Sequence, residues 1–207
     1  MSLRSAFESV LDRPDALSKI DSLIWQSLAA GSASARHPWN LGNLITIRRN
    51  QPQARTVVIR KVDKQCRTLD LFTDRRSGKI DELAENANIA WHFYTSQSKV
   101  QLRLQGQATV VTDEATVDAI WDTIPLISRA DYLSISAPGT AVNDDQPRPT
   151  SVRPRDASVS EKGRENFCIV RTKITQAEWL MLRREGHLRM TSLYSESQPP
   201  VLRWLVP

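Results

Sequence analysis

Hydrophobic and polar positions follow two periods along this chain, and the change between them separates a first helix from a series of strands. Apolar side chains in residues 15–30 recur at helical spacing, which predicts an amphipathic helix, with Pro14 suited to its first position and Gly31 to its end. These side chains belong to Leu17, Ile20, Ile24 and Leu28. The pattern then becomes alternating or continuous over short segments bounded by polar residues, as in strands joined by turns. The first three such segments are residues 41–49, 55–62 and 67–73.

The middle of the chain mixes both periods. A serine cap opens residues 77–86, which fit a short helix, and residues 113–124 continue at helical spacing after an acidic first turn. Residues 89–95 and 100–111 restore the strand pattern. In the second of these strands, Val100, Leu102 and Leu104 alternate with Gln101, Arg103 and Gln105. One face of this strand is therefore expected in the core, while the other can meet a ligand.

The C-terminal part is predicted as a loop followed by more strands. Residues 137–166 contain four prolines and no aromatic residue, which predicts a mobile loop. Thr175 and Glu178 have the spacing of a capping box that could start a helix, but the apolar positions after them do not sustain a helical stripe. We therefore favour strands, and they are placed at residues 167–174, 178–184, 188–194 and 201–207.

These elements predict a mainly β fold with flanking helices, an α+β class. We expect about seven strands in a single domain over residues 1–207, with closure into a barrel that removes exposed strand edges. Hydrophobic residues make up 40% of the chain and charged residues 25%, as in ordinary globular proteins. No apolar run approaches the roughly 20 residues of a membrane span, and the N-terminal segment lacks the apolar stretch of a secretory signal, so we expect a cytoplasmic protein.

Metal and nucleic-acid sites find little support in the sequence. Cys66 and Cys168 stand apart without a CxxC pair, and His37 and His92 have no partner that would make a metal site. The formal net charge is +5, but the basic residues recur singly in many strands instead of gathering on one element with aromatic residues between them. We therefore expect no metal, and a small phosphate compound in preference to nucleic acid.

A phosphate site is indicated around the second and third predicted strands. Arg55 and Arg60 stand at the two ends of RTVVIR, and the next strand runs into LFTDRRSGK, which supplies Thr73, Ser77 and Lys79. Guanidinium and ammonium groups supply positive charge, while hydroxyls and the free N–H groups of a helix start donate hydrogen bonds to phosphate oxygens. Taken singly, Arg55, Arg60 and Lys79 would each be interpreted as a solvated surface residue.

The same segments resemble the motifs of the pyridoxamine 5'-phosphate oxidase family. Its pattern runs R-x-V-L-L-K, then F-Y-T-N-x-x-S-R-K, then R-Q-V-x-(V)-x-G, and the corresponding segments here are residues 55–60, 71–79 and 100–106. A tryptophan, a histidine and an arginine near the family's C-terminal end match Trp179, His187 and Arg189 in spacing. The resemblance covers residues 40–205 outside the 137–166 loop, and it implies an FMN-binding split β-barrel.

The resemblance assigns the cofactor side of the site. The FMN phosphate and ribityl chain would be held by Arg55, Arg60, Ser77 and Lys79, with Thr73 nearby. The flavin would lie along the backbone of Thr56, Val57 and Val58 and meet Gln101 at its ring. Sites in this family lie across a dimer interface, so the second subunit of a homodimer would contribute Trp179 and Arg189. Without the resemblance, Gln101 would be an ordinary outer-face residue, and Trp179 is equally well explained as a core residue.

On the substrate side, Arg129 matches the family's arginine that binds the substrate phosphate. The resemblance also implies that His187 and Arg189 are catalytic residues that position the substrate. Several departures bear on this side. Glu185 reverses the charge of a family arginine, and Pro125 stands near the position of the family's substrate-binding tyrosine. The cofactor motifs depart less, at Gly78, Arg60 and Val100, which replace an arginine, a lysine and an arginine.

Three functions are compatible with this resemblance. The first is an oxidase of pyridoxamine or pyridoxine 5'-phosphate that passes electrons to oxygen. The second is a split-barrel reductase with a nicotinamide donor and a different acceptor, which Glu185 favours. The third is a non-catalytic FMN-binding or FMN-storing protein. All three expect FMN as the cofactor, a homodimer and, for the two enzymes, a small-molecule substrate.

Overall fold

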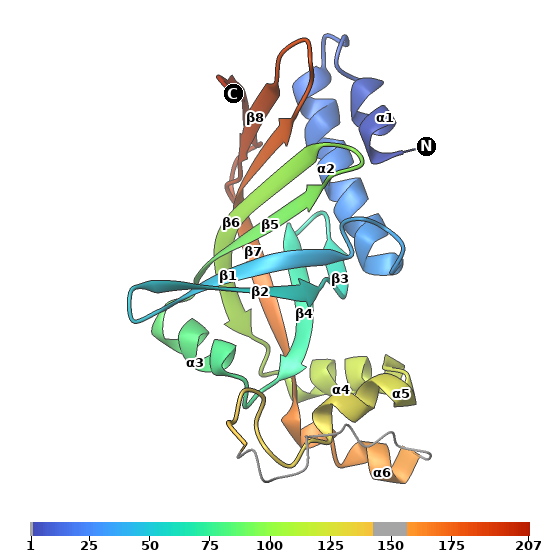
Figure 1. Ribbon diagram of the computed structural model, residues 1–207, viewed down its shortest axis with the longest axis vertical. Helices are drawn as coiled ribbons and strands as arrows, with labels where there is room; N and C mark the ends of the chain where they lie inside the picture. The colour runs from blue at the N-terminus through green and yellow to red at the C-terminus, as the bar shows by residue number, and fades with distance from the viewer. Residues whose placement is uncertain (1, 143–156) are drawn as a thin grey trace.

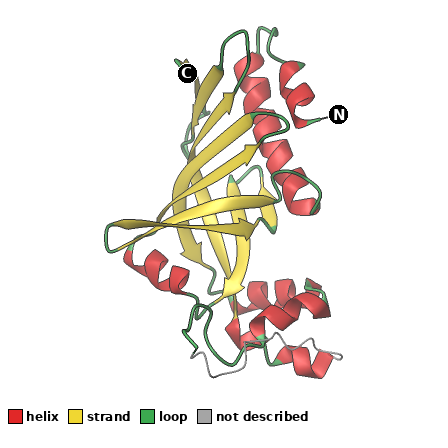
Figure 2. Cartoon of the chain, in the orientation of Figure 1, coloured by secondary structure: helices red, strands yellow, loops and turns green. Residues whose placement is uncertain are grey.

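The computed structural model describes residues 2–142 and 157–207, in which a curved antiparallel sheet carries helices toward both of its ends (Figure 1). The longest helix, α2 (Ala16–Ala33), packs along one side of the sheet together with the short α1 (Leu3–Glu8). The other helices lie toward the opposite end (Figure 2). They are α3 (Gly78–Glu85), α4 (Glu114–Thr123), α5 (Leu126–Arg129) and α6 (Ala157–Glu161), with the 3-10 turns η1 (Ala130–Tyr132) and η2 (Arg164–Asn166).

The described residues form nine strands in one sheet, and every pairing is antiparallel. The order is β2-β1-β5-β6-β7-β4-β3, and β8 and β9 continue the sheet from β7. The bounds are β1 (Leu41–Arg48), β2 (Gln51–Val58), β3 (Lys61–Asp63), β4 (Thr68–Asp74), β5 (Asn88–Thr95), β6 (Val100–Val110), β7 (Phe167–Met181), β8 (Leu188–Leu193) and β9 (Val201–Leu205). The expected mainly β fold with flanking helices is confirmed.

Strand β7 divides the sheet because its two halves have different neighbours. Its first half pairs with β4 and its second half with β8, while β6 runs along both halves. A bulge between Gln105 and Gly106 marks the change. A Cβ atom at Gly106 would lie 2.0 Å from the Lys173 carbonyl oxygen, so only glycine fits this crossing. The N–H groups of Ile59 and Arg60 each lie 2.9 Å from carbonyl oxygens beside β1 and in β4, and these bonds join the two sides of the barrel.

The core follows from the patterns of α2 and β6. Val100, Leu102 and Leu104 are fully buried, while the alternate side chains face outward, as the period of two predicts. Helix α2 covers the barrel with Ile20, Ile24 and Leu28, which are also fully buried. A second, smaller hydrophobic cluster lies under α4, at the end of the protein that carries α4, α5 and α6 (Figure 1). Its buried members are Val117, Trp121, Ile124, Tyr132, Phe167 and Ile169.

Some boundaries differ from the sequence prediction. Helix α2 continues through Gly31 to Ala33, and the predicted strand at 55–62 is divided between β2 and β3. The preference for a strand over a helix at 175–178 is confirmed, because β7 continues without interruption. Within the predicted 137–166 loop, residues 157–161 and 164–166 form α6 and η2, so that part of the prediction is corrected; residues 143–156 lie outside the described part. Helix α1 was not predicted.

Candidate functional site

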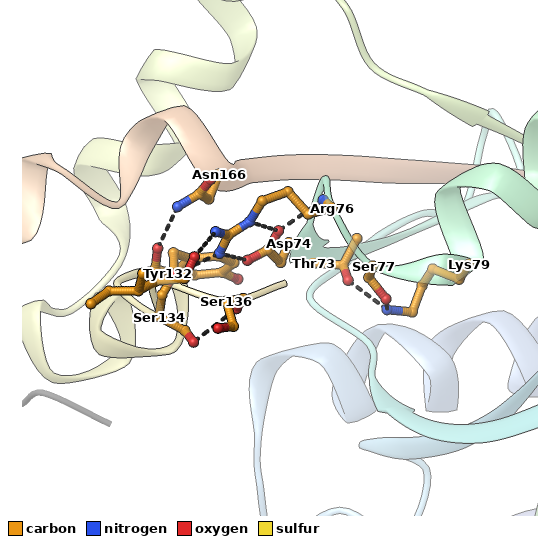
Figure 3. A network of polar contacts seen from close by, with 10 residues as sticks. Thr73, Asp74, Arg76, Ser77, Lys79, Tyr132, Ser134, Ser136 and Asn166 are labelled. Atoms are coloured by element: carbon orange, nitrogen blue, oxygen red, sulfur yellow. Dashed lines mark hydrogen bonds and ion pairs between the residues drawn. The ribbon is translucent and has the colours of Figure 1, made fainter. Parts of the chain in front are cut away.

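Lys79 lies among hydroxyl groups where β4 ends and α3 begins (Figure 3). Its Nζ donates to Thr73 Oγ1 at 2.7 Å and to Ser77 Oγ at 2.6 Å. Ser77 stands at the N-cap of α3, but its side chain makes no capping bond. Because both hydroxyl oxygens accept from the ammonium, their own hydrogens remain for an acceptor such as a phosphate oxygen. We call Lys79, Thr73 and Ser77 the Lys79 cradle.

The electrostatics of the Lys79 cradle favour an anion. Burial lowers the pKa of Lys79, and the nearby Arg55 guanidinium lowers it further. A negatively charged ligand would oppose both effects, since an opposite charge stabilises the ammonium. Cys168 pairs with Thr73 across β4 and β7, and burial raises the pKa of its thiol to about 11. The thiol therefore stays neutral near the cradle and does not compete with an anion for the ammonium.

Arg55 is fixed by a buried acid on α3. Its Nη2 donates to Glu82 Oε2 at 2.6 Å, and its Nη1 donates to the Thr46 hydroxyl, which in turn donates to Glu82. Glu82 and Thr46 are buried, whereas Arg55 is partly exposed. These bonds use two of the five N–H donors of a guanidinium, so three remain for a ligand. Glu82 was not predicted as part of the site.

The other residues of the first motif lie along the same side of the barrel. The Arg60 guanidinium is exposed and lies 6.0 Å from the centre of the Phe72 ring on β4. The Thr56 hydroxyl donates to Asn43 Oδ1 at 2.9 Å, while Val57 and Val58 are partly buried at the end of β2. The structure thus brings β2, β4 and the start of α3 together, as the phosphate-site prediction requires.

Arg76 ties the turn between β4 and α3 to residues far along the chain (Figure 3). Its Nε and Nη2 donate to the two carboxylate oxygens of Asp74 at 3.0 and 2.7 Å. Nη2 and Nη1 also donate to the carbonyl oxygens of Ser134 and Ile135 at 2.9 and 3.1 Å. The bond to the buried Asp74 raises the pKa of Arg76. This guanidinium is therefore a structural cation with little capacity left for phosphate, and its role was not predicted.

Gln101 and Arg189 lie on the outer face of the sheet. Gln101 Oε1 is 3.3 Å from Nε2 of His92 on the neighbouring strand. Arg189 Nη2 donates to Glu178 Oε1 at 2.9 Å, and the same oxygen accepts from Arg103 at 3.0 Å. These residues form a polar row across β5, β6, β7 and β8.

His187 lies in the exposed turn between β7 and β8, where its Nδ1 accepts from the Arg183 N–H at 3.2 Å. In Figure 1 this turn and α3 lie at opposite ends of the protein. One protomer therefore does not bring His187 to the Lys79 cradle. Arg189 follows His187 by two residues at the start of β8, so it lies at the same far end.

The prediction that Trp179 contacts FMN from the second subunit is corrected by its burial. The Trp179 side chain is 0% exposed, and its ring centre lies 5.2 Å from that of Phe7 in α1. Its neighbours across the sheet, Leu102 and Met190, are fully buried too. An indole enclosed on all sides reaches neither a ligand nor a second subunit, so Trp179 is a core residue and not an FMN contact.

The prediction that Arg129 binds a substrate phosphate is corrected as well, because its guanidinium is already bonded to residues around α4 and α6. Arg129 is 6% exposed, lies 4.7 Å from the Trp121 ring centre, and donates to the carbonyl oxygens of Ile124 and Trp121 at 3.1 and 2.9 Å. It also forms an ion pair with Glu161 of α6. Arg129 therefore joins α4, α5 and α6 and has no free edge for a substrate phosphate.

Residues 2–142 and 157–207 contain neither a metal-binding group nor a membrane-spanning helix. No three side chains of histidine, cysteine, aspartate or glutamate gather as a metal-binding group in this part of the chain. None of its helices is both long and apolar enough to cross a membrane.

Comparison with known proteins bears on the segment that holds the Lys79 cradle. Residues 21–112 match the model of the family described as pyridoxamine 5'-phosphate oxidase, FMN-binding domain. No curated protein matches the chain. Arg55, Thr73, Ser77 and Lys79 all fall inside the matched segment, whereas Arg129, His187 and Arg189 lie beyond it.

Solved structures extend the likeness over nearly the whole chain. A pyridoxamine 5'-phosphate oxidase-related, FMN-binding protein from Nostoc punctiforme PCC 73102 superposes with a TM-score of 0.69 at 21% identity, over 90% of this chain and 96% of that one. PhzG from Burkholderia lata 383, solved with tetrahydrophenazine-1-carboxylic acid, gives a TM-score of 0.68 at 17% identity, over 95% of each chain. At these identities the likeness shows a shared fold. Together with the family match over residues 21–112, it confirms the resemblance read from the motifs, which is a likeness to the FMN-binding domain of pyridoxamine 5'-phosphate oxidases.

Proposed function

We propose that this protein is an FMN-dependent oxidoreductase that works as a homodimer, with each FMN bound between the two subunits. The observation that carries the proposal is the Lys79 cradle, in which one ammonium and two hydroxyls stand beside the fixed guanidinium of Arg55. This donor set fits a phosphate monoester, which needs both positive charge and several hydrogen-bond donors. Bound FMN would supply hydride transfer at its isoalloxazine ring.

In this proposal one group of residues binds the FMN phosphate and another lies along the flavin ring. Arg55, Ser77 and Lys79 hold the phosphate, Thr73 donates its hydroxyl hydrogen, and Arg60 supplies a further positive charge. The flavin lies along the backbone of Thr56, Val57 and Val58. All of these residues stand on β2, β4 and the start of α3, or on the link between β2 and β3.

The homodimer is supported by the distance between the two groups of predicted site residues. The start of β6, the β7–β8 turn and the start of β8 lie toward the end of the sheet away from α3 (Figure 1), and they carry Gln101, His187 and Arg189. A second copy would therefore have to supply these residues to the first copy's cradle. The outer face also carries exposed apolar side chains, including Leu41 on β1 and Tyr94 on β5. Burying such residues is favourable, and a dimer interface is a common way to do it. A cytoplasmic location remains part of the proposal.

The substrate is proposed to be a compound other than pyridoxamine 5'-phosphate. The arginine matched to a substrate-phosphate ligand, Arg129, is occupied by structural bonds. Glu185 adds a negative charge two residues before His187, and its partner Arg183 lies 3.5 Å away. We therefore favour a reductase that takes electrons from a nicotinamide donor, with His187 and Arg189 positioning the acceptor.

The first test is the absorbance spectrum of the purified protein, with mass identification of any flavin released on denaturation. The proposal expects flavin bands and close to one FMN per chain, and light scattering after gel filtration should give twice the mass of one chain. Mixing with NADH or NADPH without oxygen should then bleach the flavin band. A protein that takes up no added FMN refutes the proposal. FMN binding without reduction by either donor, and without turnover of pyridoxamine 5'-phosphate, would identify a non-catalytic flavin-binding protein instead.

A further inference from the structure

Residues 132–136 run beside the turn that carries the Lys79 cradle, and we call them the 132–136 segment. Two successive carbonyl oxygens of this segment, those of Ser134 and Ile135, accept from one guanidinium, that of Arg76. Arg76 is itself held by both carboxylate oxygens of the buried Asp74. Charge-assisted bonds of this kind are short and directional, so the backbone of the segment is fixed and not merely near the turn.

The start of the 132–136 segment is anchored independently. The Tyr132 carbonyl oxygen accepts from Asn166 Nδ2 at 2.9 Å, and the Asn166 carbonyl oxygen accepts from the Arg75 N–H at 2.7 Å. The Tyr132 ring packs edge-on against Phe167 with their centres 5.2 Å apart. Burial raises the pKa of the Tyr132 phenol, so this side chain stays neutral in its packed position. The segment is therefore anchored at its start by Asn166 and held further along by Arg76, the residue that precedes Ser77.

The middle of the 132–136 segment exposes an apolar side chain. Ile135 is 98% exposed, although the backbone around it is tied on both sides by Arg76. A further bond within the segment, from the Ser134 hydroxyl to the Ser136 carbonyl oxygen at 2.9 Å, restrains the same turn. The fixed backbone holds this exposed apolar side chain in a defined place, where a ligand bound beside the turn could contact it.

We propose that Arg76 is a positioning residue that fixes the 132–136 segment as a wall of the FMN site, with Ile135 as the apolar contact to the bound FMN. This inference rests on the proposed function, because it takes the Lys79 cradle as the phosphate end of that site. Asp74 and Ser77 connect Arg76 to the Lys79 cradle. Ser77 follows Arg76 in the chain, and its N–H donates to the Asp74 carbonyl oxygen at 3.0 Å. The Ser77 hydroxyl accepts from Lys79. Displacement of Arg76 would therefore release the wall while leaving the cradle's own donors in place.

The test compares FMN dissociation constants of the full-length apoprotein and four variants, together with amide hydrogen exchange over residues 132–136. Arg76→Gln removes the charge and the forked geometry, and Arg76→Lys keeps the charge alone. Arg75→Gln is the matched control, because Arg75 is the adjacent, exposed arginine, and its guanidinium has one long contact of 3.4 Å to the Phe167 carbonyl oxygen. Ile135→Ser alters only the proposed ligand contact, since a side chain so exposed adds nothing to the core.

We expect faster amide exchange in the 132–136 segment and FMN binding about tenfold weaker for Arg76→Gln, a change of about 1.4 kcal/mol, with a smaller loss for Arg76→Lys. Ile135→Ser should weaken FMN binding severalfold without moving the thermal unfolding midpoint of the apoprotein, a pattern that a merely structural role would not produce. Arg75→Gln should match the wild type. The inference is overturned if Arg76→Gln loosens the segment while both it and Ile135→Ser keep wild-type FMN affinity. A wild-type chain that takes up no FMN refutes the proposed function, and the ligand contact of Ile135 with it.

Discussion

Replacing Lys79 by methionine removes the central charge of the proposed phosphate site while keeping the length of the side chain. In the structure the ammonium donates to Thr73 and Ser77 and makes no ion pair within the described residues. Methionine leaves both hydroxyls free to rotate and bond water, and it removes a cation whose pKa burial lowers. The change should therefore act on ligand binding and leave the stability of the apoprotein nearly unaltered.

The expected loss of FMN affinity in Lys79→Met follows from the interaction between the Lys79 ammonium and the FMN phosphate. Two unit charges about 4 Å apart interact by about 4 kcal/mol at an effective dielectric constant of about 20, which is an upper limit because Lys79 is only partly buried. A hydrogen bond to a charged group contributes about 1.5–3 kcal/mol after exchange with water. We therefore expect Lys79→Met to weaken FMN binding by roughly 10- to 150-fold.

Riboflavin provides the control, because it carries the same ring and ribityl chain without the phosphate. Titration of apoprotein followed by flavin fluorescence should give a large loss for FMN and almost none for riboflavin. Wild-type affinity for FMN should also fall as the pH rises through the lowered pKa of Lys79, since the neutral amine no longer attracts phosphate, and this decline should begin below the pH expected for an ordinary lysine. Equal FMN affinity in Lys79→Met and wild type, with the alkaline decline retained, would refute the assignment of the cradle.

Three further changes test other parts of the structure. Gly78→Arg should tighten FMN binding several-fold in the same titration, because an added Cβ there meets nothing within 4 Å and a guanidinium would stand at the start of α3; unchanged affinity would place the phosphate elsewhere. Gly106→Ala should cost about 3 kcal/mol or more in urea unfolding, since its Cβ would overlap the Lys173 carbonyl oxygen. Arg129→Met should lower unfolding stability by about 2–4 kcal/mol, because buried carbonyl oxygens lose their donors, while FMN affinity stays at the wild-type value; weakened FMN binding would instead return Arg129 to the ligand site.

The parts of the fold that the sequence predicts well are those set by local pattern. The alternation of Val100, Leu102 and Leu104 predicts the buried face of β6, and the spacing in α2 predicts its core-facing stripe. The serine before α3 marks the helix start, although the hydroxyl is used by Lys79 and not by the backbone. Side-chain period and turn chemistry are local properties, so one chain suffices to find them.

The errors arise where tertiary contacts decide a residue's role. Trp179 matches a family position in spacing, yet the unpredicted helix α1 brings Phe7 against it and encloses it. Arg129 precedes a segment that looked unstructured, and α6 from that segment supplies its ion-pair partner, Glu161. Neither contact leaves a mark on the local sequence, because the partners are separated by long stretches of chain.

The two arginines before the Lys79 cradle show the same limit at a finer scale. Arg75 and Arg76 are equivalent by composition, and both precede the serine of a phosphate motif. The structure separates them, because Arg76 lies against the buried Asp74 and two distant carbonyl oxygens while Arg75 stays exposed. A guanidinium whose donors are used by the protein cannot also bind a ligand, so counting basic residues in the motif overstates its capacity for phosphate. The charge available to FMN in one protomer is therefore that of Arg55, Arg60 and Lys79, and the proposed second copy would add Arg189 from the far end of the sheet.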